Sequence, residues 1–165
     1  NLLILGNLNS INEIDYNSAV QFLNVFIFSL YDALYHAASA TISELAADSK
    51  HLGAKVGYIC ILHTWGSEMN FIHIHTILLG GGLTSNNQWK DNGENFFFPI
   101  QVISKVFRGK YLEELKRLWE EDKLVFHGTA EKLRNHYTFK ELLNSCYGMD
   151  WGFLTAKRTS MVPGQ

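Results

Sequence analysis

The segment FIHIHTILLGGGL, residues 71–83, places two histidines one residue apart in an apolar run, and three glycines follow it. Its β-branched and aromatic residues predict a strand over 71–79 that the glycines at 80–82 end. Because side chains alternate between the faces of a strand, His73 and His75 share one face at roughly 6.5–7 Å. A buried imidazole needs a hydrogen-bond partner or a metal, so the pair is either satisfied by protein groups or part of a metal site.

The preceding segment predicts the partner of this strand. VGYICILHTWG, residues 56–66, has the same apolar character, and GSEMN, residues 66–70, has the length and polarity of a hairpin loop. If the pairing continues up to that loop, His63 lies directly opposite His73, and opposed residues project to the same face. A slip of one residue would turn His63 to the other face. In the predicted register three imidazoles converge and leave coordination positions open, which is typical of a catalytic metal site.

Two longer segments carry a resemblance to a known family. ELAADSKHLGAKVGYICILHTWGSEMNFIHIHTILLGGGLTSNNQW (44–89) and FFFPIQVISKVFRGKYLEEL (96–115) closely resemble the two-tyrosine HUH rolling-circle transposases of bacterial insertion sequences. The resemblance runs from about Leu30 to the end of the chain. The family's HUH motif falls on residues 73–75, and the LHTWG segment supplies His63. Family members often read His-Pro-His-hydrophobic-His here, and we interpret the Phe-Ile at 71–72 as the loss of an accessory histidine.

The resemblance implies both a fold and a reaction. The fold is α+β, with an antiparallel sheet that carries the HUH motif and is flanked by helices. The reaction is the nicking and transfer of single-stranded DNA at insertion-sequence ends through a phosphotyrosine intermediate. The implied cofactor is a divalent metal, Mg²⁺ or Mn²⁺, which polarises the scissile phosphate and is held by His63, His73 and His75. Imidazole also suits Zn²⁺, Ni²⁺ and Co²⁺.

The family's nucleophiles form a Tyr-x3-Tyr pair on a helix, downstream of a segment that resembles DWGFLTAKRTSMVPGQ (150–165). The chain's own pair of this spacing, Tyr31 and Tyr35, precedes the HUH strand and lies in a helical apolar stripe, so we interpret it as core or boundary aromatics. We therefore expect residues 1–165 to be a single, partial HUH domain whose catalytic residue is unidentified. The upstream zinc module and the downstream tyrosine segment of the family are expected to be absent.

Composition predicts one globular domain in the cytoplasm. The chain has 165 residues, of which 47% are hydrophobic and 18% charged, and we find no signal peptide. Polar residues interrupt the apolar stretch 19–34, which indicates a buried helix and not a membrane span. Cys60 and Cys146 are too far apart to form a zinc site and are interpreted as reduced thiols.

Charge gives two opposed indications about DNA. The net charge of −2 and the isoelectric point near 6.4 count against nucleic-acid binding by the chain as a whole. One segment, SKVFRGKYLEELKR (104–117), nevertheless combines a helical apolar stripe with basic side chains. Its functional interpretation is a phosphate-contacting patch. The alternative is an ordinary solvated helix face on which glutamates partly cancel the charge. The candidate DNA-contacting residues are Lys105, Arg108 and Lys110.

The rest of the chain mixes strands and helices, which supports the α+β class. The first residues, between 7 and 17, read as loop, and LTSNNQWKDNGENFFF (83–98) predicts a hairpin-like excursion into a short strand. The elements predicted beyond the helix at 104–117 are a short strand near 124–126, a helix near 139–146 and a strand near 151–155.

Three functional classes stay open at this point. The first is a metal-dependent DNA strand transferase domain, and the second is a non-catalytic remnant that binds DNA or a partner protein. The third, a zinc hydrolase unrelated to DNA, needs a carboxylate base, for which Glu68 in the predicted loop is the only nearby candidate. The sequence sets no oligomeric state.

Overall fold

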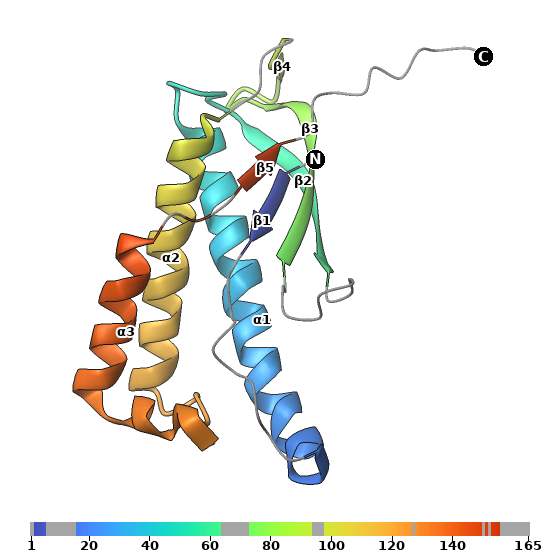
Figure 1. The fold of residues 1–165 in the computed structure, drawn as a ribbon. Coiled ribbons are helices and arrows are strands. Elements are labelled where there is room, and N and C mark those ends of the chain that lie inside the picture. The colour runs from blue at the N-terminus through green and yellow to red at the C-terminus, as the bar shows by residue number, and fades with distance from the viewer. Residues whose placement is uncertain are drawn as a thin grey trace.

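A computed structural model of the chain describes residues 2–5, 16–63, 73–93, 98–126, 128–149, 151 and 153–155, with the side chains of 2–5, 16–28, 63 and 153–155 outside that description. Figure 1 shows the elements in the order β1 (Leu2–Leu5), α1 (Tyr16–Ala47), β2 (Lys55–His63), β3 (His73–Leu83), β4 (Trp89–Asp91), α2 (Ile100–Glu120), the 3₁₀ helix η1 (Gly128–Arg134), α3 (His136–Gly148) and β5 (Phe153–Thr155).

The strands form one antiparallel sheet, which confirms the predicted α+β class. Its order is β2-β3-β1-β5, and β4 pairs with β3 beside this path. The strand β1 lies between β3 and β5, since Leu3 pairs with both His75 and Leu154. Both ends of the described chain therefore contribute strands to the neighbourhood of the histidine-bearing strand.

The register of β2 with β3 is the one that the sequence predicts. His63 pairs with His73 and Ile61 with His75. The predicted hairpin loop at 66–70 lies outside the described residues. The paired strands continue to a bulge, where β3 advances four residues from Leu78 to Gly82 while β2 advances two. The alternation of burial is interrupted within the bulge, where Leu79 and Gly80 are both exposed. Because both numbers are even, Gly82 beyond the bulge faces the core as Ile74 does, with Leu52 3.1 Å from the position of a Cβ.

The glycine triplet does not end β3, and the prediction that it does is wrong. The strand runs through residues 80–82 to Leu83 and pairs there with β4. A Cβ at Gly81 would lie 2.5 Å from the Lys90 carbonyl oxygen, and one at Gly82 would lie 2.6 Å from the Lys55 carbonyl oxygen. These glycines therefore let the flanking strands approach closely.

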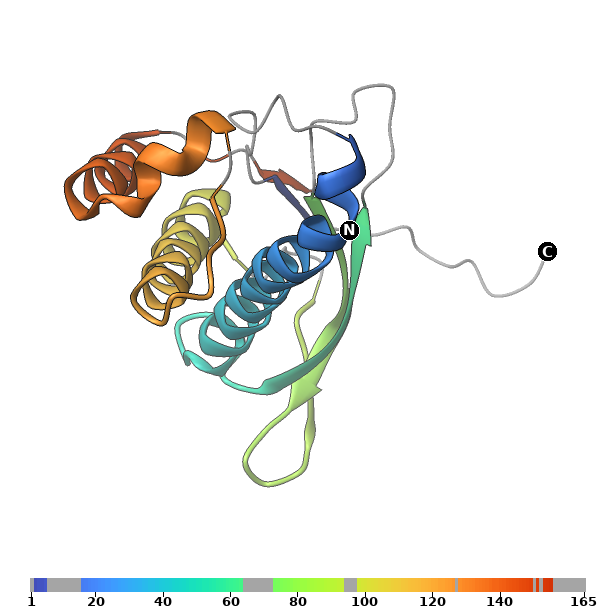
Figure 2. The same cartoon turned by 90° about the horizontal axis from the view of Figure 1, so that it is seen from below.

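One face of the sheet is covered by helices (Figures 1 and 2). The long helix α1 packs against β2 and β3, and α2 packs against α1. The core between them is tight, because Ala38, Ile74 and Phe107 each have no more than a trace of solvent exposure. Helix α1 is long, but it is not apolar enough to cross a bilayer. No other helix among the described residues is both long and apolar enough.

The remaining elements follow the sequence in part. Helix α2 begins directly after Pro99, and Asn135 caps α3 by accepting hydrogen bonds from two backbone N–H groups of its first turn. The strand predicted near 151–155 is present as β5. The strand predicted near 124–126 is wrong, because Leu124 and Phe126 are buried there without forming a strand. Strand β1 was not predicted. Residues 7–15 of the predicted loop lie outside the described residues, and residues 16 and 17 belong to α1, so the loop prediction is wrong for these two.

Candidate metal centre

Strand β3 has one face in the core and one face away from the helices. Ile74 and Thr76 point into the core and are fully buried. On the other face, which we call the outward face, His73 and His75 are half-buried, and Ile77 is about half exposed. The pleat of the strand, together with α1 and α2 on the opposite side, therefore places both histidines on the side of the sheet that these helices leave uncovered.

The two imidazoles converge on each other. The Nε2 atoms of His73 and His75 lie 3.1 Å apart, and the ring centroids are 4.9 Å apart with an interplanar angle of 60°. Two nitrogen lone pairs at this separation repel unless a proton or a cation lies between them. Since metal–imidazole bonds are near 2 Å, a separation of 3.1 Å is short enough for one ion to bind both nitrogens. The pair thus fits a shared metal ion.

The third predicted ligand, His63, is placed by its backbone alone. Its Cα is paired with that of His73, which is the register that the three-histidine site requires. The His63 side chain lies outside the description, so its contacts are not known from the structure. Among the side chains that are described, no group of three or more metal-binding residues is found. The three-histidine site remains a prediction that the register supports.

Tyr31 and Tyr35 lie on α1 and not on the outward face. The Tyr35 hydroxyl accepts a hydrogen bond of 2.8 Å from the backbone N–H of Leu62, at the edge strand of the sheet. Burial raises the pKa of the Tyr31 hydroxyl above its ordinary value. Both observations agree with the interpretation of these tyrosines as boundary aromatics, because the sheet separates α1 from the histidine pair.

The other described tyrosines are also on the helix side. Tyr58 faces α1 and hydrogen-bonds the hydroxyl of Ser39 at 2.5 Å, and Tyr111 is buried in α2. Tyr137 and Tyr147 belong to α3, which lies beyond α2 in Figure 1. Within the residues described with side chains, no tyrosine hydroxyl stands beside His73 and His75. The carboxylate Glu68, which a zinc hydrolase would need, is outside the described residues.

The three basic residues proposed from the sequence lie on α2, across the molecule from the histidines. Lys110 forms a 2.6 Å ion pair with Glu44 of α1, and Arg108 donates a 2.8 Å hydrogen bond to the carbonyl oxygen of Met149. Lys105 is exposed. Two of the three cations are thus engaged by protein oxygens, which leaves Lys105 as the most accessible of them.

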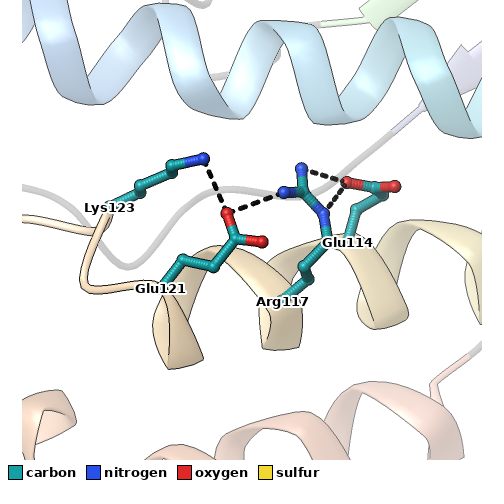
Figure 3. Close-up of polar contacts among 4 residues, drawn as sticks. All are labelled: Glu114, Arg117, Glu121 and Lys123. Atoms are coloured by element: carbon teal, nitrogen blue, oxygen red, sulfur yellow. Dashed lines mark hydrogen bonds and ion pairs between the residues drawn. The ribbon is translucent and has the colours of Figure 1, made fainter.

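The end of α2 carries an ion-pair network of its own (Figure 3). Arg117 binds Glu114 and Glu121, both at 2.8 Å, and Lys123 binds Glu121 at 2.6 Å. Hydrogen bonds from Lys123 and Arg117 lower the pKa of Glu121 below its ordinary value. At this end of the helix the basic side chains Lys116 and Arg117 are therefore paired with nearby glutamates, as the solvated-face interpretation expects.

The outward face also carries large apolar side chains that sequence reasoning did not identify as functional. Exposed fractions are 62% at Ile59, 48% at Ile61, 46% at Ile77 and 54% at Leu79. The available signal was the near-continuous apolar character of both strands, which indicates burial on two faces. The described elements cover only one of those faces.

Comparison with known proteins gives two matches. Residues 57–162 match the model of the family described as "Putative transposase". The chain is also similar to "Putative transposase y4qJ" of Sinorhizobium fredii (strain NBRC 101917 / NGR234), with 33% identity over 124 residues that cover 74% of this chain and 31% of that protein. The chain thus spans about a third of this relative's length. No solved structure matches.

Proposed function

Because the chain belongs to the "Putative transposase" family, we propose that it forms the metal-binding part of a transposase that nicks and transfers single-stranded DNA. Within this proposal the fold is of the HUH endonuclease type, and the metal ligands are His63, His73 and His75. The observation that carries the proposal is the 3.1 Å approach of the two Nε2 atoms on the outward face. The register that pairs His63 with His73 supports the third ligand.

The proposed chemistry is phosphoryl transfer to tyrosine. A tyrosine oxygen attacks the phosphorus, a bond to the 5′ phosphate forms, and the bond to the 3′ oxygen breaks, after which the 3′ hydroxyl carries the proton. His63, His73 and His75 would hold a divalent cation, Mg²⁺ or Mn²⁺, and the bound ion would supply positive charge to polarise the scissile phosphate and offset its developing charge. No tyrosine described with its side chain lies on the outward face, and the resemblance implies a Tyr-x3-Tyr pair downstream of residues 150–165. We therefore place the nucleophile in that downstream pair, beyond residue 165.

A second candidate function follows from the same observation about tyrosines. Without a nucleophile on the outward face, the domain would bind DNA or a partner protein and would not cut. The two candidates make different predictions for a denaturing gel, because a covalent phosphotyrosine link survives denaturation and a complex held by noncovalent contacts does not.

The test combines strand cleavage with metal binding. A longer protein, extended through the downstream Tyr-x3-Tyr pair that the resemblance implies, should form a gel-shifted covalent adduct with labelled single-stranded DNA in Mg²⁺ or Mn²⁺, and EDTA should abolish it. The 165-residue chain should form none. Mn²⁺ at a hundredfold excess over its Kd should stabilise the chain by about 2.7 kcal/mol, which corresponds to a melting temperature higher by roughly 5–10 °C.

The matched variants separate the ligands from other histidines. The double variant His73→Ala, His75→Ala should lose both the adduct and the Mn²⁺ response, whereas His36→Ala, an exposed histidine of α1, should keep both. An unchanged Mn²⁺ response in the double variant would contradict the metal site. A metal response without any adduct from the longer protein would favour the non-catalytic candidate, and an adduct from the 165-residue chain would contradict our placement of the nucleophile.

A further inference from the structure

The outward face forms an apolar stripe beside the histidines. Ile59 pairs with Ile77, Ile61 pairs with His75, and Leu79 follows along the strand. These four aliphatic side chains are 46–62% exposed, so they form one contiguous patch next to the candidate metal centre. Contiguous exposed apolar patches mark binding surfaces more often than single exposed residues do.

Trp89 extends this stripe at the far end of β3. It pairs with Leu83 and therefore shares the outward face with it. Its ring reaches across to Gly81, where a Cβ would lie 2.6 Å from Cζ2 and 2.8 Å from Cε2 of the indole. Because Gly81 has no side chain, the indole ring has room to lie over it, and 55% of Trp89 stays exposed.

Gly81, over which the Trp89 ring lies, is on the same strand, β3, as the histidines. Gly81 follows His75 by six residues, which is about 20 Å at the rise of a β-strand. Stacked DNA rises 3.4 Å per nucleotide, so roughly six stacked nucleotides, or fewer extended ones, span the same length. A strand bound at the histidines can therefore reach Trp89 along this face.

The charge around Trp89 points to base stacking and not to phosphate binding. Lys55, opposite Leu83, and Asp91, opposite Gly81, share this face and balance each other in charge. The Asp91 carboxylate also accepts a 2.6 Å hydrogen bond from the backbone N–H of Gly93. An exposed aromatic ring in neutral surroundings recognises the π-face of a base and gains little from the backbone.

We propose that Trp89, seated over Gly81, stacks on a base of the single-stranded DNA whose phosphate lies at the histidines, and that the apolar stripe lines the path between them. This inference rests on the proposed function, because it takes single-stranded DNA as the ligand. It assigns to the β3–β4 hairpin the task of positioning the strand, several nucleotides away from the site of cleavage.

The test compares two ligands that differ only in their bases. Fluorescence anisotropy measures the Kd of the 165-residue chain for dT15 and for an abasic strand of the same length. Trp89→Ala should raise the Kd for dT15 about 5- to 150-fold, leave the Kd for the abasic strand unchanged and leave the salt dependence unchanged. Trp89→Phe should retain most of the affinity, and Tyr137→Ala, which removes an exposed aromatic of α3, should retain all of it.

Two further measurements keep the outcomes distinct. The Mn²⁺ response of Trp89→Ala reports whether the metal centre stays folded, and Ile77→Ser, which leaves the hairpin intact, should weaken dT15 binding on its own. Three results would overturn this inference and leave the proposed function standing. They are an equal loss of affinity of Trp89→Ala for both strands, no loss of its affinity for dT15, and a wild-type dimer that Trp89→Ala dissociates. Failure of the wild-type chain and of the longer protein to bind either strand would overturn the proposed function itself.

Discussion

A single added carbon at Gly81 should disturb the hairpin that holds Trp89. In Gly81→Ala the new methyl group would lie 2.5 Å from a backbone oxygen of β4, and backbone cannot move aside as a flexible side chain can. We expect a loss of about 1–3 kcal/mol in the free energy of unfolding, measured by urea denaturation.

Gly80→Ala is the matched control for that substitution. Nothing lies within 4 Å of a Cβ at Gly80, so the free energy of unfolding should stay the same or rise by up to about 1 kcal/mol. Equal losses in both variants would show that chain conformation at the glycines, and not close approach of β4, explains the triplet.

The same residues show what sequence can predict at this scale. The register of His63 with His73 was predictable, because the polar loop and the apolar strands beside it fix the pairing. The role of Gly81 was not, because local propensity treats a glycine run as the end of a strand. What decides the matter is the approach of Trp89 and Lys90, and those partners are known only after the sheet is assembled.

Among the elements, α2 is joined to the segment before β5 by an aromatic cluster. Phe107 stacks on Tyr111 at 5.9 Å, and Trp151 meets Tyr111 edge-on at 5.8 Å. Burial raises the pKa of the Tyr111 hydroxyl, and the nearby Cys146 raises it further. Ionisation of this hydroxyl is therefore less favourable in the folded chain than in the unfolded chain.

The pKa shift of Tyr111 predicts alkaline destabilisation. In the unfolded chain the hydroxyl ionises near pH 10, whereas in the folded chain it stays protonated to a higher pH. Its contribution is thus fully present below pH 10 and is lost as the pH rises towards the folded-state pKa, by about 1.4 kcal/mol at pH 11. Tyr111→Phe should show a correspondingly smaller loss of unfolding free energy between pH 8 and pH 11.

Tyr137→Phe serves as the control for that pH series, since Tyr137 is 78% exposed. Its loss between pH 8 and pH 11 should match that of the wild-type chain. A Tyr111→Phe profile that coincides with the wild type would contradict the role of the buried hydroxyl.

Helices and strands were predicted correctly where a periodic apolar pattern extended over many residues, and they were missed or wrongly predicted where the segment was short. The pattern over 104–117 and the one near 139–146 each predicted a helix, and the structure has α2 and α3 there. The four residues of β1 are too few to show a period, and their partners are remote in sequence. Leu124 and Phe126 are apolar and buried, and an apolar segment can be buried without pairing with a strand.

For the whole molecule, the sheet separates two surfaces for which DNA contacts are predicted. The histidines and Trp89 lie on the outward face. Lys105 lies on α2, and Figure 2 shows that α1 and α2 lie on the other side of the sheet. Lys105→Gln should weaken single-strand binding uniformly across sequences and reduce the slope of log K against log salt by about one. Lys140→Gln, an exposed lysine of α3, should change neither quantity.

Salt titrations at several ionic strengths measure both slopes. If Lys105→Gln and the wild type have the same slope, α2 makes no phosphate contact and the strand occupies the outward face alone. The net charge of −2 is compatible with either outcome, because the slope of log K against log salt depends on the phosphates that are contacted and not on the charge of the whole chain.

The position of β1 in the sheet has a consequence for how the chain folds. Leu3 must find Leu154, a partner near the opposite end of the described chain, and both belong to strands that complete the sheet beside His75. Contacts between residues so distant in sequence form slowly, because the entropy of loop closure opposes them. During synthesis the β2–β3 hairpin and α1 can assemble first, whereas β5 joins only after nearly the whole domain has been translated. We therefore expect the candidate metal centre to reach its final rigidity late, as β5 docks.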